Sequence, residues 1–372
     1  MSKTKNNKLL GKELNIVGIV GKNGKSTVGQ ILHYCYLALE IENILESATE
    51  FSNKMHAKSY EKNIKDAIIE TCVCSIKGKK ASYIDFNSLI FTNSSKNADP
   101  DEKWTMMRPF IALPLDKTAI INIDDEQGVA FCDVTVAKIL TYAITEQADI
   151  NARNIKMTID KTEFDLYYQG SFAYKTEIPY FGIYNVYNAL AVIAHLIGEG
   201  YDLARVAQLL PSLPQIKGNF DTLATETDVK IVVDYARTPE AVEAILKSLA
   251  TVCKGNVITV IGADGNTSTT QRSVIGKNAL AYSKKVIFTN DNPRTEEPQS
   301  IIYDLIKGNI KQNYRICIDR EKAIEIALKM AKPKDVVILL GKGHEKTQTI
   351  GKRTNTFCDK TTAKYLAQKF EI

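Results

Sequence analysis

LNIVGIVGKNGKST, residues 14–27, is the stretch that decides the fold. Its first half, residues 14–20, is a short apolar and largely β-branched run, and residues 26–40 after the glycines are expected to form a helix. A buried strand, a glycine turn and a helix in this order predict a phosphate-binding loop, because glycines let backbone N–H groups converge on an anion at the positive end of a helix dipole. The strict GxxxxGK[ST] spacing fails at Ile19, whereas the shorter GxxGK[ST] form is met in full.

The loop contains the residue types that a triphosphate with Mg²⁺ requires. We expect Lys25 to neutralise the β- and γ-phosphates and Ser26 to place its hydroxyl on Mg²⁺. The alternative, a glycine turn with a surface lysine, is disfavoured because the flanking strand and helix are the context that this motif demands. The expected phosphate contacts are Gly21, Asn23, Gly24, Lys25, Ser26 and Thr27.

The composition excludes several classes of protein. A chain of 372 residues that is 44% hydrophobic is long enough for two domains. Its 48 basic and 43 acidic residues nearly cancel and are spread along the chain, so nucleic-acid binding is not expected. No apolar run is long enough for a membrane span or a signal peptide, which predicts a cytoplasmic protein without a membrane partner. Seven cysteines without framework spacing are interpreted as reduced thiols.

The pattern of apolar runs predicts two α/β halves. In the first half we expect strands at 67–75, 88–92 and 118–122, a polar loop at 93–103, a small β portion at 155–178 and a buried helix at 186–198. Two prolines and a glycine in residues 211–218 indicate a linker. Beyond it, strands at 230–234, 257–262, 285–290 and 336–341 alternate with helix-length segments, which is typical of a mostly parallel sheet with helices on both faces. The expected domains are 1–214 and 215–372.

A series of further motifs follows the phosphate loop. They are IIETCVCS (68–75), FTN (91–93), AIINIDDE (119–126), GIYNVYNALA (182–191), IVVDYARTPEAV (231–242), TNDNPRTEEP (289–298) and GKGHE (341–345). With these motifs in this order, almost the whole chain resembles the Mur ligases, most closely their muramoyl-tripeptide synthetase branch. The resemblance implies a P-loop Mur ligase central domain with a parallel sheet, followed by a C-terminal Rossmann-like α/β domain.

The resemblance also implies an activity. A carboxylate would be phosphorylated by ATP, with Mg²⁺, to an acyl phosphate, and the amine of an amino acid would attack it to give an amide, ADP and phosphate. Phosphoryl transfer of this kind depends mainly on positioning and charge neutralisation. The implied catalytic residues are Lys25, Glu70 and Arg108, with Ser26 and Glu70 on the metal. Nucleotide contacts would come from Asn185, Asn188, Asp234 and Arg272, and contacts to the amino acid from Asp291, Asn292, Arg294, Gly341, His344 and Glu345. Arg294 would clamp a carboxylate bidentately, and Glu345 would hold the ammonium group.

The sequence departs from the family in four places. No segment before the phosphate loop is long enough for the family's amino-terminal UDP-sugar domain, so we expect a donor other than a UDP-linked muramoyl peptide. The threonine-threonine-proline signature is missing from a region that contains Lys54, His56 and Lys58 instead, which we interpret as surface residues. Asn97 and Ala98 stand where the family has an aspartate and a histidine. Arg108 stands where the family has a carbamoylated lysine. We hypothesise that Arg108 replaces part of the charge of a second magnesium ion near the γ-phosphate. Arg237 stands for the histidine of DYAHTP, and Gly218–Asp221 for GRME.

Several ordinary interpretations stay open. Glu70 is also compatible with a strand-end carboxylate in water, Asn185 and Asn188 with residues of a helix start, His344 with a structural histidine and Arg294 with an exposed loop residue. Asp124 and Asp125 are as compatible with turns or caps as with ligand binding. Two other functions also fit: a nucleotide-binding pseudoenzyme or regulatory subunit, and a tripeptide synthetase that acts with a separate UDP-sugar-binding protein.

Overall fold

The computed structural model describes residues 14–48, 64–72, 75–76, 84–95, 98–223, 225–309 and 311–372. The chain divides into two compact units, whose bounds are Met1–Pro179 with Ile183–Pro214 and Tyr180–Gly182 with Gln215–Ile372. The division therefore falls between residues 214 and 215, and the short segment 180–182 groups with the second unit. The interpretations of Lys54, His56, Lys58, Cys74 and Asn97 lie outside the described residues.

The first unit is built on a nine-stranded sheet in the order β2-β3-β1-β4-β5-β6-β7-β8-β9. In this order, neighbouring strands from β2 through β1 and on to β7 pair in parallel, whereas β8 pairs antiparallel with both β7 and β9. Its strands are β1 (Asn15–Val20), β2 (Asn43–Ser47), β3 (Asp66–Thr71), β4 (Ser88–Phe91), β5 (Thr118–Asn122), β6 (Lys138–Ala143), β7 (Ile150–Met157), β8 (Thr162–Tyr168) and β9 (Ser171–Ile178).

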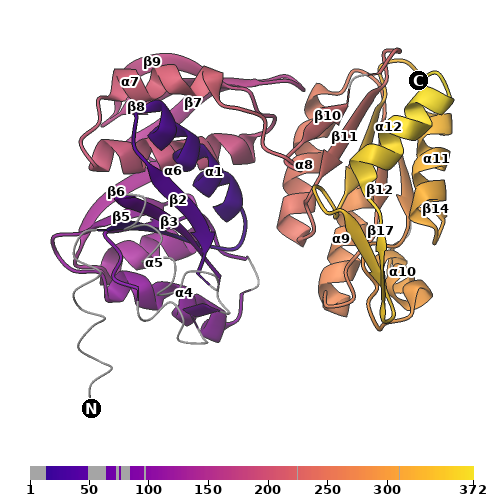
Figure 1. Cartoon of the computed structure of the whole chain (residues 1–372), viewed down its shortest axis with the longest axis horizontal. Helices are drawn as coiled ribbons and strands as arrows, with labels where there is room; N and C mark the ends of the chain where they lie inside the picture. The colour runs from indigo at the N-terminus through magenta and orange to yellow at the C-terminus, as the bar shows by residue number, and fades with distance from the viewer. Residues whose placement is uncertain are drawn as a thin grey trace. The chain divides into compact units, whose positions relative to one another are not determined.

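Helices cover both faces of this sheet (Figure 1). The helices are α1 (Lys25–Ala38), α4 (Pro100–Ile111), α5 (Glu126–Val134), α6 (Ile183–Gly198) and α7 (Leu203–Leu209), followed by the short 3-10 helix η2 (Leu210–Ser212). Helices α1 and α6 contact each other on one face, and α4 and α5 contact each other on the other. Apolar side chains of β1, β3, β4 and β5 fill the space under α4 and α5, where Phe91, Phe110 and Phe131 pack together. This core fixes the carboxyl ends of the four central strands, where the phosphate loop lies.

Two local expectations in the first unit are wrong, and a third gives an element that is too short. The strand expected at 67–75 ends at Thr71, and Ser75 is helical. The polar loop expected at 93–103 is interrupted by α4, which begins at Pro100 because the Asp99 side chain accepts a hydrogen bond of 2.7 Å from the Glu102 N–H and caps the helix. The small β portion is longer than expected, since β7 begins at Ile150.

The second unit has a six-stranded sheet in the order β10-β11-β15-β12-β13-β14, parallel except for β10. The mostly parallel sheet expected from the sequence is thus confirmed. The strands are β10 (Asp221–Leu223), β11 (Lys230–Asp234), β12 (Val257–Ile261), β13 (Lys285–Phe288), β14 (Tyr314–Ile316) and β15 (Val336–Leu340), with a hairpin of β16 (Thr347–Ile350) and β17 (Arg353–Thr356).

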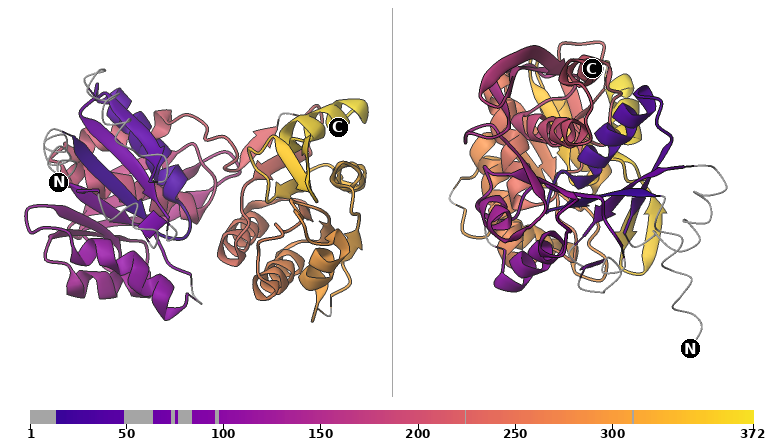
Figure 2. Two further views of the ribbon diagram at one scale, coloured as in Figure 1. Left: turned by 60° about the horizontal axis from the view of Figure 1, so that its bottom comes forward. Right: turned by 90° about the vertical axis from the view of Figure 1, so that its left-hand side faces the viewer.

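The helices of the second unit lie on both faces of its sheet (Figure 2). They are α8 (Pro239–Val252), α9 (Thr269–Tyr282), α10 (Pro298–Ile306), α11 (Arg320–Met330) and α12 (Asp359–Lys369). Helices α11 and α12 pack on one side against an apolar cluster that includes Ile231, Val260 and Leu339, while on the other side α9 contacts both α8 and α10. Parallel strands of this kind gather their carboxyl ends at one edge of the sheet.

The structure also bears on two expectations drawn from the composition, the absence of a membrane span and the state of the cysteines. Among the described residues, no helix is long and apolar enough to cross a membrane. Cys72 is disulfide-bonded, whereas the five other described cysteines are free. The expectation of reduced thiols is therefore wrong for Cys72.

Candidate functional site

The loop between β1 and α1 has the backbone shape that its glycines predict. Gly21 has φ +149° and Gly24 has φ +86°, values that residues with a side chain rarely adopt. Gly24 is the last residue before α1, and a Cβ placed there would lie 2.4 Å from Asn188 Oδ1. No residue larger than glycine fits at this point without moving Asn188, so the loop and α6 approach each other closely.

Thr92 and Asn93, which follow β4, hold the loop in place. The Asn23 N–H donates to Asn93 Oδ1 at 2.9 Å, and the Asn23 carbonyl accepts from Asn93 Nδ2 at 3.0 Å and from Thr92 Oγ1 at 2.8 Å. The Lys22 N–H donates to the Asn93 carbonyl at 2.8 Å. The FTN motif thus has a positioning role that its sequence alone did not reveal, because the motif lies some 70 residues from the loop it holds.

Ser26 and Glu70 meet at the carboxyl edge of the sheet. Ser26 Oγ donates to Glu70 Oε2 at 2.6 Å, although the two residues lie 44 positions apart. A hydroxyl and a carboxylate are hard oxygen ligands, and Mg²⁺ in nucleotide sites is usually held by one or two protein oxygens together with phosphates and water. The described residues contain no cluster of three or more metal-binding side chains. The pair therefore fits a Mg²⁺ that is bound mainly through a triphosphate.

The Lys25 ammonium is folded back onto the loop. Its Nζ donates to the Gly21 carbonyl at 2.8 Å and to the Lys22 carbonyl at 3.1 Å. Burial lowers the pKa of this amine, the charge of Glu70 raises it, and the neighbouring Lys22 lowers it, so that the pKa lies below its usual value. A phosphate group near the loop would raise the pKa of Lys25 again, because a nearby negative charge favours the charged form of the amine. Thr27, the remaining predicted contact, lies in the first turn of α1.

Asn185 and Asn188 are brought to the loop by α6. Both are buried, and Asn188 Nδ2 donates to Asn185 Oδ1 at 3.1 Å. Asn188 is the residue that faces Gly24. Their contact with a nucleotide stays a prediction.

Asp124 and Asp125 behave as the turn and cap residues considered above: Asp125 caps α5, and Asp124 accepts hydrogen bonds from the backbone of residues 144–146.

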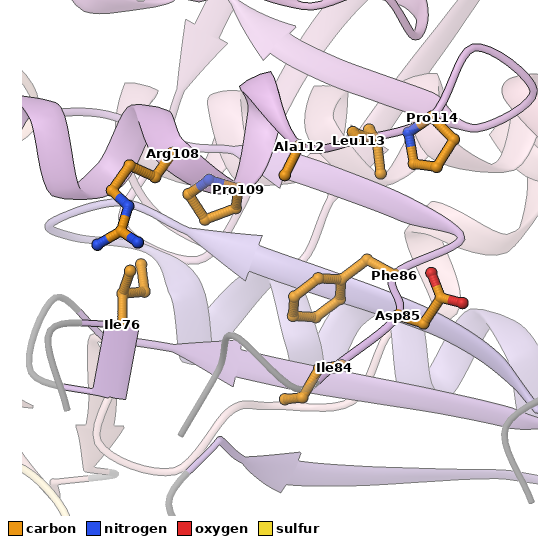
Figure 3. Close-up of a pocket in the computed structure, with 9 residues that line it drawn as sticks. All are labelled: Ile76, Ile84, Asp85, Phe86, Arg108, Pro109, Ala112, Leu113 and Pro114. Atoms are coloured by element: carbon orange, nitrogen blue, oxygen red, sulfur yellow. The ribbon is translucent and has the colours of Figure 1, made fainter. Parts of the chain in front are cut away.

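Arg108 lines a cavity to which the phosphate loop does not contribute. It lies near the end of α4 and lines a cavity of about 210 Å³ with apolar neighbours such as Ile76, Phe86 and Leu113 (Figure 3). In Figure 3 its guanidinium group points toward Ile76, and Asp85 lies at the other end of the cavity. No residue of the loop lines this cavity. The placement gives no support to the hypothesis that Arg108 replaces a metal charge near the γ-phosphate.

In the second unit, polar residues gather where four parallel strands end. Asp234 ends β11, and its carboxylate accepts from the backbone N–H groups of Phe220 at 2.6 Å and Ala236 at 2.7 Å. Burial raises the pKa of Asp234 to about 6 against the effect of these two hydrogen bonds. Asp291 follows β13, is also buried, and its Oδ1 accepts no hydrogen bond from any described residue. Gly341 (φ +109°) after β15 lets the chain pass beside Asp291, since a Cβ there would lie 2.4 Å from Asp291 Oδ2.

Glu345 is held by three donors. Its carboxylate accepts from Arg237 Nη2 at 2.8 Å, Asn292 Nδ2 at 2.9 Å and Lys342 Nζ at 3.1 Å. Burial raises the pKa of Glu345, but these hydrogen bonds outweigh it, and the pKa lies below its usual value. The Lys342 side chain is fully buried and also donates to the Thr347 carbonyl at 2.7 Å. Glu345 is therefore a fixed carboxylate that is paired with the cationic side chains of Arg237 and Lys342.

An aromatic stack lies beside this carboxylate. The rings of Tyr235 and His344 are 5.0 Å apart with an interplanar angle of 29°, and the Arg237 guanidinium lies 3.7 Å from the centre of the Tyr235 ring. Gly218 allows the approach of His344, because a Cβ there would lie 2.7 Å from the His344 nitrogen. Arg237 and Lys342, which the sequence did not single out as site residues, thus belong to the same cluster as His344 and Glu345.

Arg294 and Arg272 are both paired with carboxylates. Arg294 Nε and Nη2 each lie 2.9 Å from a carboxylate oxygen of Asp264. Arg272 is buried, and it pairs with Glu296 at 2.5 Å and with Asp304 at 3.0 Å. Arg272 Nη2 also donates to the Gly265 carbonyl at 3.0 Å. The structure therefore shows Arg272 connecting two loops of the second unit, and its contact with a nucleotide stays a prediction.

Comparison with known proteins places these two units in one family. Residues 102–196 match the model of the Mur ligase middle domain, and residues 220–343 match that of the Mur ligase glutamate ligase domain. The UDP-N-acetylmuramoyl-L-alanyl-D-glutamate--2,6-diaminopimelate ligase 1 of Clostridium acetobutylicum is 35% identical over 374 residues, which cover 94% of this chain and 77% of that protein. The corresponding ligase of Clostridioides difficile is 32% identical over 94% of this chain and 78% of its own length.

Solved structures share the fold. A UDP-N-acetylmuramoyl-L-alanyl-D-glutamate--2,6-diaminopimelate ligase matches with a TM-score of 0.67 and 24% identity, covering 97% of this chain and 80% of that one. MurF from Acinetobacter baumannii matches with a TM-score of 0.76 and 14% identity over 97% of this chain and 78% of its own. A Mycobacterium tuberculosis folylpolyglutamate synthase, complexed with ADP and AMPPCP, matches with a TM-score of 0.74 and 13% identity over 91% and 90% of the two chains.

Proposed function

This chain belongs to the Mur ligase family, and we propose that it uses the phosphate loop of its first unit and the carboxyl edge of its second sheet to join a small carboxylate to a diamino acid. As a member of the family it is an ATP-dependent ligase that forms an amide bond and uses Mg²⁺. The carboxylate takes the γ-phosphoryl group of ATP to become an acyl phosphate, and the amine displaces phosphate from it. The products are the amide, ADP and phosphate.

The observation that carries the assignment of residues is the contact of 2.6 Å between Ser26 Oγ and Glu70 Oε2 beside the glycine loop. Lys25, Ser26 and the loop N–H groups would bind the phosphates, and Ser26 and Glu70 would hold Mg²⁺, which supplies positive charge where phosphoryl transfer develops negative charge. Asn185 and Asn188 are proposed nucleotide contacts on the basis of their place beside Gly24. Asp234 and Arg272 are the proposed nucleotide contacts of the second unit.

The acceptor is proposed to bind at the carboxyl edge of the second sheet. Arg294 would bind a carboxylate of the amino acid, and Glu345 and Asp291 would face an ammonium group, with Asn292, Gly341 and His344 around them. Asp291 supports this assignment, because its buried Oδ1 accepts no hydrogen bond among the described residues and an ammonium group would supply one. The relatives are named for 2,6-diaminopimelate, a diamino acid with two carboxylates. We therefore choose diaminopimelate as the acceptor to test.

The proposal has two forms, which differ in the carboxylate substrate that donates the acyl group. The relatives are named for UDP-N-acetylmuramoyl-L-alanyl-D-glutamate, whose dipeptide ends in a carboxylate. In the first form this chain acts on a small carboxylate without a nucleotide sugar. In the second it acts on the UDP-linked dipeptide, with a separate protein that binds the UDP-sugar.

The test measures ADP formation by the whole chain with Mg²⁺, ATP and diaminopimelate, with each donor in turn and with the UDP-linked dipeptide plus candidate partner proteins. We expect ADP only when a carboxylate and an amine are both present, and a new amide by mass spectrometry. Lys25→Met should abolish both signals, while Lys352→Met, at a position on the β16–β17 turn, should leave them unchanged. Tight ATP binding with no ADP under any combination would contradict the proposal and favour a nucleotide-binding pseudoenzyme.

A further inference from the structure

Arg294 is held in a conformation that an arginine adopts only under constraint. Its φ is +54°, in the left-handed region that is unfavourable for a residue with a long side chain. The Arg294 N–H donates to the Thr349 carbonyl at 3.1 Å, and the Arg294 carbonyl accepts from the Gly351 N–H, so the β16–β17 hairpin fixes the backbone from both sides. Strained backbone of this kind persists only where the surroundings over-determine it, and it is found preferentially at ligand-binding sites.

The Arg294 side chain is fixed as well, by Asp264. One edge of the guanidinium, formed by Nε and Nη2, lies against the Asp264 carboxylate with contacts of 2.9 Å from Nε to Oδ1, 3.2 Å from Nε to Oδ2 and 2.9 Å from Nη2 to Oδ2. The Asp264 side chain is 9% exposed and Arg294 is 44% exposed, so the buried partner anchors the open one. Asp264 Oδ1 also accepts from the Asn266 N–H at 2.8 Å, which fixes the carboxylate in turn.

The loop that carries Asp264 is locked to the loop that carries Arg294. The Gly265 N–H donates to the Asn292 carbonyl at 2.9 Å, and a Cβ at Gly265 would lie 2.3 Å from the Pro293 carbonyl oxygen. The pairing of Asp264 with Arg294 is therefore set by two closely packed turns and is not a chance contact of two flexible side chains. This distinguishes it from ordinary surface ion pairs, which contribute little.

The second edge of the guanidinium remains open. A guanidinium has two edges that can each bind one carboxylate through two parallel hydrogen bonds. Asp264 occupies the Nε–Nη2 edge, and Nη1 donates to no described residue. The Nη1–Nη2 edge is thus available on the exposed side of Arg294, at the same carboxyl edge of the sheet as Asp291 and Glu345.

We propose that Asp264 is a positioning residue for the acceptor amino acid: it turns Arg294 so that the open Nη1–Nη2 edge receives the acceptor's carboxylate. The inference rests on the proposed function, in which Arg294 binds that carboxylate. Arginine loses rotamer freedom when it binds, and a guanidinium that is already oriented loses less. Asp264 also offsets part of the Arg294 charge, so its contribution is to geometry and selectivity for a planar carboxylate more than to electrostatic attraction.

The experiment compares Asp264→Asn with wild-type protein, with diaminopimelate as the probe. Asparagine keeps the size of the side chain but cannot accept from Nε and Nη2 with both oxygens. We expect the dissociation constant of diaminopimelate, measured by calorimetry, to rise about tenfold, and the KM for diaminopimelate to rise equally. The KM for ATP should stay within about twofold of wild type. An unchanged or tighter dissociation constant for diaminopimelate would overturn the proposal.

Two controls separate this role from a structural one. Asp335→Asn removes an equally buried carboxylate at the amino edge of the same sheet, where it accepts from the Asn256 and Lys332 N–H groups, and it should not change diaminopimelate binding. A diaminopimelate diamide, which lacks carboxylates, should bind wild type and Asp264→Asn equally weakly, because Asp264 acts only through Arg294 and a carboxylate. A loss of diamide binding in Asp264→Asn alone would show a general structural defect and contradict the proposal.

Arg294→Gln distinguishes failure of this inference from failure of the proposed function. If Arg294→Gln weakens diaminopimelate binding and Asp264→Asn does not, the role of Asp264 is wrong and the acceptor site stands. If Arg294→Gln has no effect, or wild-type protein does not bind diaminopimelate, the proposed acceptor site itself is wrong.

Discussion

Glu70 is the residue whose proposed role is most directly testable. Its carboxylate lies 2.6 Å from Ser26 Oγ, and the amide of Glu70→Gln would weaken the ligand field for a hard divalent cation. We expect Glu70→Gln to raise the Mg²⁺ concentration for half-maximal ADP formation by at least about tenfold. Glu163→Gln, on strand β8, is the control and should leave the Mg²⁺ dependence unchanged. Equal dependence in Glu70→Gln and wild type would exclude Glu70 as a metal ligand.

Asp234 predicts a pH dependence of stability. Burial raises its folded pKa to about 6, above the value of about 3.9 in an unfolded chain. Between about pH 4 and pH 6 the folded protein therefore binds more protons at this site than the unfolded chain, so this group's contribution to the free energy of unfolding falls as pH rises through the window. The slope from one group is at most about 1.4 kcal/mol per pH unit.

The measurement compares denaturant unfolding of wild type and Asp234→Asn at several pH values between about 4 and 7. Asparagine does not titrate, and it leaves one of the Phe220 and Ala236 N–H groups without a carboxylate oxygen, which should cost about 1–3 kcal/mol. The advantage of wild type over the variant is expected to shrink between about pH 4 and pH 6 and to change little above pH 7. An advantage that grows with pH would show that Asp234 has a depressed pKa.

At the scale of single residues, the sequence predicts which residues belong to a site better than it predicts which side chains they contact. The meeting of Ser26 with Glu70 follows from two motifs at the ends of neighbouring parallel strands, β1 and β3. The partner of Arg294 does not follow, because Asp264 lies in a turn after β12, beyond the strand expected at 257–262, and no motif points to it. The role of Arg108 stays a hypothesis for a related reason: the sequence gives its position in the chain but not its neighbours, and in the structure it lines a cavity together with Ile76 and Phe86.

The junction of the phosphate loop with α1 gives a prediction at the scale of elements. Gly24→Ala would place a methyl group 2.4 Å from Asn188 Oδ1 in a backbone conformation with φ +86°, so both α6 and the loop would have to shift. We expect the dissociation constant of Mg²⁺ with ATP to rise more than tenfold, since the backbone N–H groups would no longer converge.

Gly170→Ala is the matched control for Gly24→Ala. Gly170 has a similar φ of +79°, but nothing lies within 4 Å of a Cβ placed there. Both variants should lose about 1 kcal/mol of stability through backbone strain. Only Gly24→Ala should lose nucleotide binding, as measured by calorimetry. If the two variants bind ATP equally well, the close approach of α6 to the loop is not needed for nucleotide binding.

The elements that were predicted correctly are those buried on both faces. Strands β1, β4, β5, β12, β13 and β15 are continuous apolar runs because helices cover both sides of the two sheets. Strand β6 was missed because its first residues, from Lys138, are exposed and its apolar run is short. Helix α4 was missed in part because its first turn is polar and its last turn contains Pro109, both of which suggest a loop when the Asp99 cap is not considered.

At the scale of the whole molecule, each unit has its own apolar core. The core of the first unit includes Phe91, Phe110 and Phe131, and that of the second includes Ile231, Ala323 and Leu339. The linker at 211–218 was predicted from composition, and the units divide between residues 214 and 215, where Pro214 follows the last helical segment, η2. A ligand that binds to one of the two units should therefore be detectable as a change in the melting temperature of the chain, even where the fold itself stays the same.

Mg²⁺ with ATP is expected to raise the melting temperature of the chain. A ligand at 100 times its dissociation constant stabilises the folded state by about 2.7 kcal/mol. For a unit of roughly 150–250 residues this corresponds to a shift of roughly 5–10 °C. EDTA should remove most of the shift produced by ATP, because the triphosphate would lose the cation that Ser26 and Glu70 share with it. Glu70→Gln should show the smaller shift even with Mg²⁺ present, whereas Glu163→Gln should match wild type in scanning calorimetry. A full shift in EDTA would mean that the loop binds ATP without a metal, and the ligand role of the Ser26 and Glu70 pair would then have to be abandoned.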